Sequence, residues 1–165
     1  MTKKSSQKIA QKNLKLRDQL WPKITDEMLW NRKNKKGFTT IPRTLPHFFR
    51  IMDDLSSGQP LSATYFVLWC RAFDEHVVTI SNPRDFAFES GFSGQRAEQT
   101  WRGRMKKLKE LGFILAAEGA SGEFNYVLIL NPYYVVKELK DQISHARYNT
   151  LIERSQNIGA DDLLE

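Results

Sequence analysis

The stretch from Ser81 to Leu130, SNPRDFAFESGFSGQRAEQTWRGRMKKLKELGFILAAEGASGEFNYVLIL, decides the fold of this 165-residue chain. Asn82 and Pro83 are typical of a helix start, because Asn caps free backbone N–H groups and Pro lacks one. Gly91 fits the left-handed residue that ends such a helix. The stretch therefore predicts a short helix, a tight turn, a long helix over residues 94–111, and two strands around a Gly-rich tip.

The predicted helix over residues 94–111 has an apolar face and a basic polar face. Ser93 is placed to cap its start. At about 100° per residue, one sector is apolar except for one arginine; it holds Ala97, Trp101, Arg104, Met105, Leu108 and Leu111. The opposite sector is polar and mostly basic, and it holds Gln95, Gln99, Arg102, Lys106 and Lys109. We expect the first sector to be buried and the second to face a partner.

The two predicted strands form a hairpin after Gly112, which suits a helix C-terminus. They run from Phe113 to Glu118 and from Glu123 to Leu130, around the tip Gly119–Gly122. This tip carries no Lys or Arg, and a glutamate flanks it on each side. Any contact that it makes to a polyanionic partner would have to come from Ser121 or from backbone N–H groups.

This order of elements resembles the winged helix-turn-helix superfamily of DNA-binding proteins. The residues that carry the resemblance are Phe86-Ala87, Gly91-Phe92 and Ser93, at the spacing that these proteins use. The resemblance implies an α+β fold, mostly α, in which the hairpin is the wing and extra helices lie at the N- and C-terminal ends. It also implies a double-stranded DNA partner, with the helix over 94–111 in the major groove.

One departure from the family pattern concerns Leu108 and the Leu111-Gly112-Phe113-Ile114 segment. They follow Ser93 about one helical turn later than in the common pattern. Either the second helix is unusually long, or it bends near Gly103.

The polar face suits base reading, because Gln pairs bidentately with adenine and Arg with guanine. We expect the lysines to meet phosphates, which fix position rather than sequence. The candidate DNA-binding residues are Arg84, Ser93, Gln95, Arg96, Gln99, Arg102, Lys106, Lys107 and Ser121. The alternative is an ordinary amphipathic surface helix with a solvated basic face.

Charge is segregated along the chain. The net charge is +6, with 11 Lys and Arg against three acids in residues 1–36 and six against one in residues 95–109. The rest of the chain is therefore acidic. Such segregation indicates a polyanionic partner, whereas a solubilising tail is the alternative for residues 1–36.

Four segments are predicted: a basic N-terminal arm (1–36), a winged helix-turn-helix domain (37–132), a C-terminal helix (133–158) and an acidic tail (159–165). The arm should hold a weakly amphipathic helix over residues 1–20 and a short one over 26–31, capped by Thr25. The domain should start with a strand over 38–41, followed by helices over 45–55 and 62–73 and a strand over 77–80.

The predicted C-terminal helix has an apolar stripe formed by Val136, Leu139, Ile143 and Ala146. Such a stripe either packs on the domain or pairs with its twin in a homodimer. Because winged helices that bind operators often dimerise through terminal helices, the homodimer is favoured.

The sequence contains no credible catalytic constellation, so an enzyme, a cofactor, a metal centre and a small-molecule site are not expected. His47, His76 and His145 are scattered, and Asp74-Glu75-His76 is typical of a solvated turn. The single cysteine, Cys70, lies in an apolar run and is expected to be a buried thiol. No run approaches the roughly 18 apolar residues of a membrane span, and a cytoplasmic location is expected.

Three functions fit these patterns. The first is a sequence-specific transcriptional regulator that binds a symmetric site as a dimer. The second is a replication or maintenance protein of a bacterial plasmid or phage, because LKELGFI (108–114) and YVLILNPYYV (126–135) are similar to segments of plasmid replication initiators. The third is a winged helix used for protein–protein contact.

Overall fold

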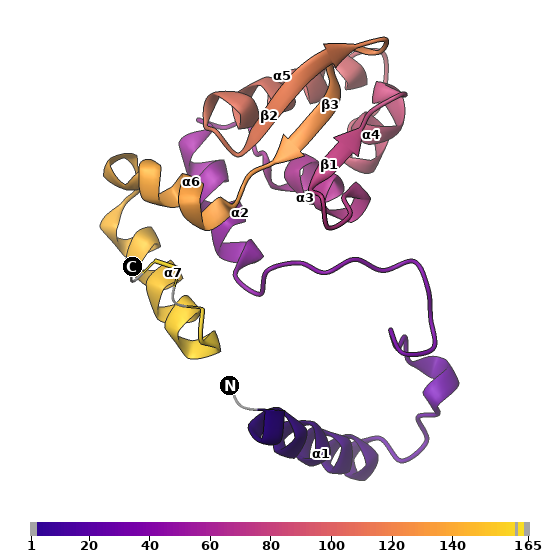
Figure 1. Cartoon of the computed structure of the whole chain (residues 1–165). Helices are drawn as coiled ribbons and strands as arrows, with labels where there is room; N and C mark the ends of the chain where they lie inside the picture. Colours follow the sequence, from indigo (N-terminus) through magenta and orange to yellow (C-terminus); the bar gives the residue numbers. More distant parts are fainter. Residues whose placement is uncertain (1–2, 161, 164–165) are drawn as a thin grey trace. The chain divides into compact units, whose positions relative to one another are not determined.

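The computed structural model describes residues 3–160 and 162–163 of the chain (Figure 1). The chain divides into two units, Met1–Phe38 and Thr39–Glu165. In the part that the structure describes, seven α-helices and one three-stranded antiparallel sheet make up an α+β fold that is mostly helical. None of these helices combines the length and apolar character needed to cross a membrane.

The first unit contains the helix α1 (Lys3–Leu20) and a single 3-10 turn, η1 (Asp26–Met28). The prediction of a helix in residues 1–20 is confirmed. The short helix predicted over 26–31 is wrong: only one turn forms, and Thr25 makes no side-chain cap. No side chain of residues 6–38 is buried. Among these residues α1 therefore has no apolar core to pack on, although such packing provides most of a helix's stability.

The second unit begins with two helices, α2 (Leu45–Leu55) and α3 (Ser62–Arg71). The bounds of α2 agree with the prediction, and its buried face includes Leu45, Phe48 and Met52. Asp53, near the end of α2, caps α3 across the turn. Its Oδ1 accepts from the backbone N–H groups of Leu61 and Ser62 at 2.6 and 2.9 Å. A single carboxylate therefore fixes how one helix follows the other.

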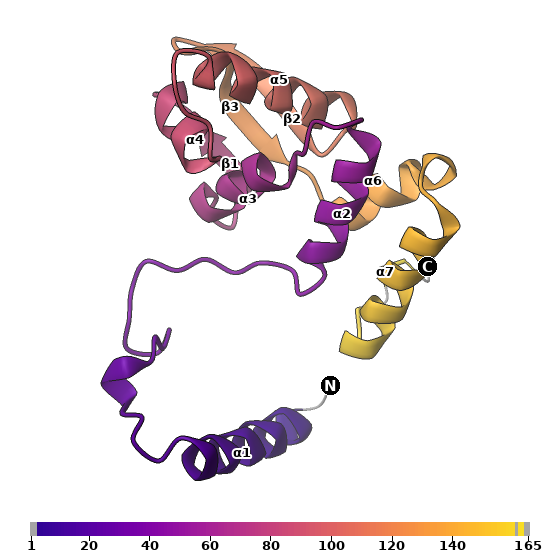
Figure 2. The same cartoon turned by 180° about the vertical axis from the view of Figure 1, so that it is seen from behind.

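The sheet comprises β1 (Val77–Thr79), β2 (Ile114–Gly119) and β3 (Gly122–Ile129), in the order β1-β3-β2. Its two faces differ in burial. The inner face carries the buried side chains of Val78, Ile114, Val127 and Ile129. Figure 1 looks onto the opposite face with α5 behind the sheet, and Figure 2 shows α3, α4 and α5 in front of it. The helices therefore cover one side of the sheet.

Two helices, α4 (Pro83–Glu89) and α5 (Ala97–Glu110), connect β1 to the β2–β3 hairpin. They pack against each other and against α3. The centre of this packing is Trp101 on α5, which is fully buried and lies edge-on to Phe124 of β3, with ring centroids 6.0 Å apart. Aromatic pairs of this geometry stabilise a core beyond their buried area.

The chain ends in α6 (Pro132–Glu138), the 3-10 turn η2 (Lys140–Gln142) and α7 (His145–Ile158). The prediction of one helix over 133–158 is wrong, because Ile143 has an extended backbone and Ser144 starts a new helix as its N-cap. The Ser144 Oγ accepts from the backbone N–H of Arg147. Within the predicted stripe, Val136 and Ile143 are buried against the unit's own core.

Two further predictions are wrong. Residues 38–41 form no strand, and Phe38 and Ile41 are exposed; a β-prone segment needs a neighbouring strand to complete its hydrogen bonds. Cys70 is exposed rather than buried. It shares the solvent side of α3 with Phe66, so this helix is not buried on all sides despite its apolar sequence.

Candidate nucleic-acid interface

The first helix of the predicted helix-turn-helix, α4, starts and ends where the sequence predicts. The Asn82 Oδ1 caps α4 by accepting from the backbone N–H of Arg84 at 3.3 Å, and Phe86 and Ala87 are buried. Gly91 ends the helix with a φ of 87°, in the left-handed region. These predictions are confirmed, and they place the exposed Arg84 in the first turn of α4.

The second helix starts later than predicted, at Ala97 rather than Gly94. Gly94 has a φ of 81°, which takes the backbone away from a right-handed helix. Ser93 therefore does not cap α5, and Arg96 at the N-cap position makes no side-chain cap bond. Gln95 and Arg96 lie in an exposed turn before the helix rather than on it.

The late start of α5 also shortens the helix that leads to Leu108 and Gly112. α5 itself has 14 residues and is continuous through Gly103, and an exposed connection from Ser93 to Arg96 precedes it. The alternative of an unusually long helix is wrong. The outcome is a helix of ordinary length behind a longer, exposed connecting loop.

The face of α5 predicted to be buried is buried, and the opposite face is exposed. Trp101, Met105 and Leu108 have no exposed surface. The exposed positions of the loop and helix include five of the nine candidate residues, namely Ser93, Gln95, Arg96, Gln99 and Lys106. Gly103 is exposed beside them, and its missing side chain would let a backbone phosphate come near the helix.

Arg102 is occupied by contacts within the protein. Its Nη2 and Nε donate to Oε1 of Glu98 at 2.9 and 3.2 Å, and Nη2 also approaches the carbonyl of Ser121 at 3.4 Å. Glu98 in turn reaches Nε of Arg84 at 3.9 Å through its other oxygen. Glu98 therefore holds two of the predicted DNA-binding arginines together and partly neutralises them.

Ser121 is turned inward at the tip of the β2–β3 hairpin. Its hydroxyl donates to the carbonyl oxygen of Ile80, and its N–H lies 3.3 Å from Oδ1 of Asn125. The Asn125 amide, 5% exposed, also donates to the Ile80 carbonyl at 3.2 Å. This role of Asn125 is not predicted from the sequence, where its one signal is a lone amide between Phe124 and Tyr126.

The lysines of α5 differ in their partners. Lys107 pairs with Glu110 at 3.5 Å, and Lys109 pairs with Glu123 of β3 at 3.0 Å. Lys106 forms no ion pair with any residue that the structure describes. Of the three lysines on this helix, Lys106 is thus the one most readily available to an anion.

An open hollow of about 580 Å³ lies beside the start of α5, lined by Arg84, Phe88, Ser93, Gln95 and Glu98 among others. Phe88, next to the buried Ala87 on α4, is 77% exposed here. Elsewhere in the described ranges, no three His, Cys, Asp or Glu side chains are grouped so that they could hold a metal ion.

The hollow adjoins the exposed loop and the start of α5, because Ser93, Gln95 and Glu98 line it, and the exposed Phe88 gives it an apolar part. Comparison of the chain with models of protein families, with curated proteins and with solved structures found no match.

Proposed function

We propose that residues 37–132 form a winged helix-turn-helix domain that binds double-stranded DNA. In this proposal α4 and α5 are the helix-turn-helix, the β2–β3 hairpin is the wing, and α5 enters the major groove. The chain then acts in the cytoplasm as a sequence-specific transcriptional regulator, and the C-terminal segment 133–158 is an addition to the domain.

The observation that carries this proposal is the division of α5 into a buried apolar face and an exposed polar face that carries Gln99 and lysines. Gln99 and Lys106 project from the exposed face, and Gln95 and Arg96 extend it through the preceding loop. Gln reads adenine bidentately, and the basic side chains neutralise phosphates. Helix-turn-helix proteins contact bases mostly with the N-terminal residues of the recognition helix. Gln99 lies in the first turn of α5, and Gln95 and Arg96 lie in the loop just before it.

The contacts of Arg102 and Ser121 assign these two residues a different role. Arg102 spans from Glu98 to the hairpin tip, and Ser121 is bonded to the end of β1. We propose that they position the wing against α5 rather than contact DNA. Since the wing has no basic tip, the N-terminal arm with its excess of Lys and Arg supplies phosphate contacts in its place.

The test is selection of bound duplexes from a random pool by the full chain, followed by affinity measurements at several salt concentrations. We expect a recovered motif, and an affinity that falls steeply with salt because phosphate contacts release counterions. No recovered motif together with a flat salt response would contradict the proposal. An inverted repeat indicates a dimeric regulator, whereas direct repeats indicate a replication or maintenance protein.

A second candidate, protein–protein contact, is favoured by the outer face of the sheet. Val77, Leu115 and Leu128 lie side by side in the register of the three strands, and all three are exposed, as is Tyr126. Clustered exposed apolar side chains often mark interaction sites. If the duplex test fails, this face becomes the leading candidate site.

A further inference from the structure

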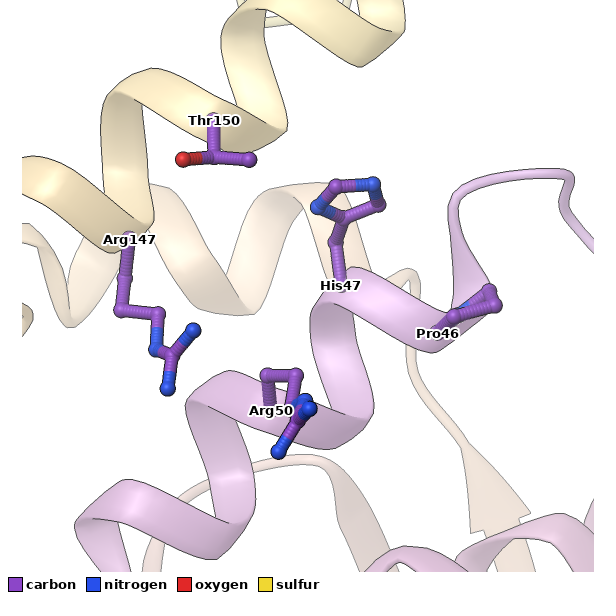
Figure 3. A pocket seen from close by; sticks show the side chains of 5 residues that line it. All are labelled: Pro46, His47, Arg50, Arg147 and Thr150. Atoms are coloured by element: carbon purple, nitrogen blue, oxygen red, sulfur yellow. The ribbon is translucent and has the colours of Figure 1, made fainter.

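A hollow of about 240 Å³ lies between α2 and α7, outside the proposed DNA-reading surface. It is lined by Pro46, His47 and Arg50 of α2 and by Arg147 and Thr150 of α7. Figure 3 shows the His47 ring and the Arg147 guanidinium in the space between the two helices. This hollow is not anticipated from the sequence, because it joins residues about 100 positions apart.

The positions of the side chains around the hollow are set by the core beneath it. His47 and Arg50 are one helical turn apart on α2, next to the buried Phe48 and Ile51. On α7, Arg147 and Thr150 flank the buried Tyr148 and precede the buried Leu151. Functional groups on rigid elements lose little conformational freedom when a ligand binds.

The hollow is cationic. Arg154, further along α7, lies near enough to His47 to act on it electrostatically: burial first, and then the charge of Arg154, lowers the pKa of His47. Arg147 pairs with Asp54 of α2 at 2.7 Å, so its charge is compensated. Arg50 and Arg154 form no ion pair among the residues that the structure describes. Like charges gathered this way repel one another unless an anion lies between them.

We propose that the α2–α7 hollow binds a phosphoryl group. The guanidinium groups of Arg50 and Arg147 are the main donors, since their planar N–H forks match phosphate oxygens. His47 contributes a ring N–H, and Arg154 adds positive potential. The Thr150 hydroxyl donates to the carbonyl of Ala146 at 2.7 Å. Thr150 therefore lines the hollow without donating a hydrogen bond to the ligand.

The size of the hollow favours one small anionic group. Its volume is below the roughly 300–1,000 Å³ of pockets that enclose whole drug-sized ligands. The phosphoryl group could belong to a small phosphorylated molecule or to the backbone of bound DNA. The inference does not rest on the proposed DNA binding, because its first readout uses inorganic phosphate alone.

The test follows the His47 titration by NMR in the full chain, in inorganic phosphate and in chloride at equal ionic strength. A bound anion favours the imidazolium form, so phosphate should raise the pKa of His47 by roughly one unit relative to chloride. The charged groups near His47 are Arg50 on its own helix, Arg147 and Arg154 on α7, and Asp54, which pairs with Arg147. A titration that is the same in both salts overturns the proposal.

Two variants separate the hollow from general charge effects. Arg50→Gln should abolish most of the phosphate-dependent shift, while the folded spectrum is retained because the Arg50 side chain is exposed. Lys137→Gln removes the same charge from an exposed position on α6, outside the lining of the hollow, and should leave the shift unchanged. An equal loss in both variants, or no loss in Arg50→Gln, overturns the site.

The source of the phosphoryl group is decided by repeating the comparison with a DNA duplex. If Arg50→Gln weakens binding of all duplexes by about the same factor, the hollow holds a backbone phosphate. If duplex affinity is unchanged while the phosphate response of His47 is lost, the hollow takes a small phosphorylated molecule. Failure of DNA binding altogether leaves the inorganic phosphate readout intact, so the two proposals fail separately.

Discussion

Arg102 donates two hydrogen bonds to one carboxylate oxygen of Glu98, at 2.9 and 3.2 Å, one turn earlier on α5. An Arg–carboxylate pair on a helix surface contributes only about 0.3–0.5 kcal/mol to stability. The pair therefore affects the electrostatic potential of this surface more than the stability of the fold. It puts a negative charge at the centre of the face that we propose meets DNA.

Replacing this carboxylate should strengthen DNA binding. Glu98→Gln removes a charge that repels phosphates and frees Arg84 from its ion pair. We expect the free energy of duplex binding, measured by fluorescence anisotropy, to improve by roughly 1 kcal/mol, the size of one charge–charge interaction at close range in water. Glu110→Gln removes the same charge at the other end of α5, and as the matched control it should change the affinity less. Weaker binding by Glu98→Gln would mean that the Glu98–Arg102 ion pair, by holding the wing in position, matters more for binding than the charge of Glu98.

Substitutions of Gln99 and Lys106 should have different effects on DNA binding, because we expect Gln99 to contact a base and Lys106 to contact a phosphate. Gln99→Ala should reduce discrimination between the selected motif and a scrambled duplex by about 1–3 kcal/mol, because a bidentate base contact is lost. Lys106→Ala should weaken all duplexes alike and lower the salt slope by about 1. Competition binding at two salt concentrations measures both effects. An unchanged sequence preference in Gln99→Ala would place the reading residues in the Gln95–Arg96 loop instead.

The sequence was most informative where one local rule decides the structure. The three- and four-residue spacing of apolar side chains gives the bounds of α2, and the Asn82-Pro83 pair gives the start of α4. Gly91 and Gly112 have the left-handed backbone that their positions after a helix require. In each case the residues that determine the conformation lie within one or two turns of it.

The predictions failed where a distant partner decides the outcome. Residues 38–41 have β propensity, but no strand lies beside them to form a ladder. The orientation of Arg102 depends on where the hairpin tip lies, 19 residues later. The sequence does not indicate the sign of φ at Gly94, so the prediction extends the helix to this residue. The positive φ of Gly94 excludes it from the helix, and for the same reason Ser93 is not the N-cap.

The carboxylate of Asp53 should contribute more to the free energy of unfolding than the carboxylate of its neighbour Asp54. Asp53 accepts two backbone N–H groups at the start of α3 and the Ser62 hydroxyl at 2.8 Å, whereas Asp54 forms one exposed pair with Arg147. We expect Asp53→Ala to lower the free energy of unfolding by about 1–2 kcal/mol, as for the loss of a helix cap. Asp54→Ala should cost less than about 1 kcal/mol. Urea denaturation of the two variants compares them, and equal losses would contradict the capping role.

Cys70 should be accessible to alkylation in the native protein but slow to react near neutral pH. Partial burial of the thiol, and then the charge of Glu89, raises the pKa of Cys70 above its ordinary value. Because the thiolate is the nucleophile, a raised pKa lowers the fraction of Cys70 that is thiolate near neutral pH. The alkylation rate of Cys70 should therefore still increase with pH in the range where the rate of an ordinary free thiol has become constant. Glu89→Gln should lower the pKa and speed the reaction. Iodoacetamide rates followed by mass spectrometry test this, with Glu75→Gln as the control.

Leu151 on α7 should report whether the C-terminal segment packs on its own domain. Its side chain has no exposed surface within the single chain, and α7 packs against α2. We expect Leu151→Ala to lower the free energy of unfolding by about 2–5 kcal/mol through cavity formation, while the exposed Asn149→Ala changes little. The unfolding midpoint of the wild-type chain should not depend on protein concentration if this contact is intramolecular. A midpoint that rises with concentration, and a dimer lost on Leu151→Ala, would instead restore the homodimer predicted from the apolar stripe.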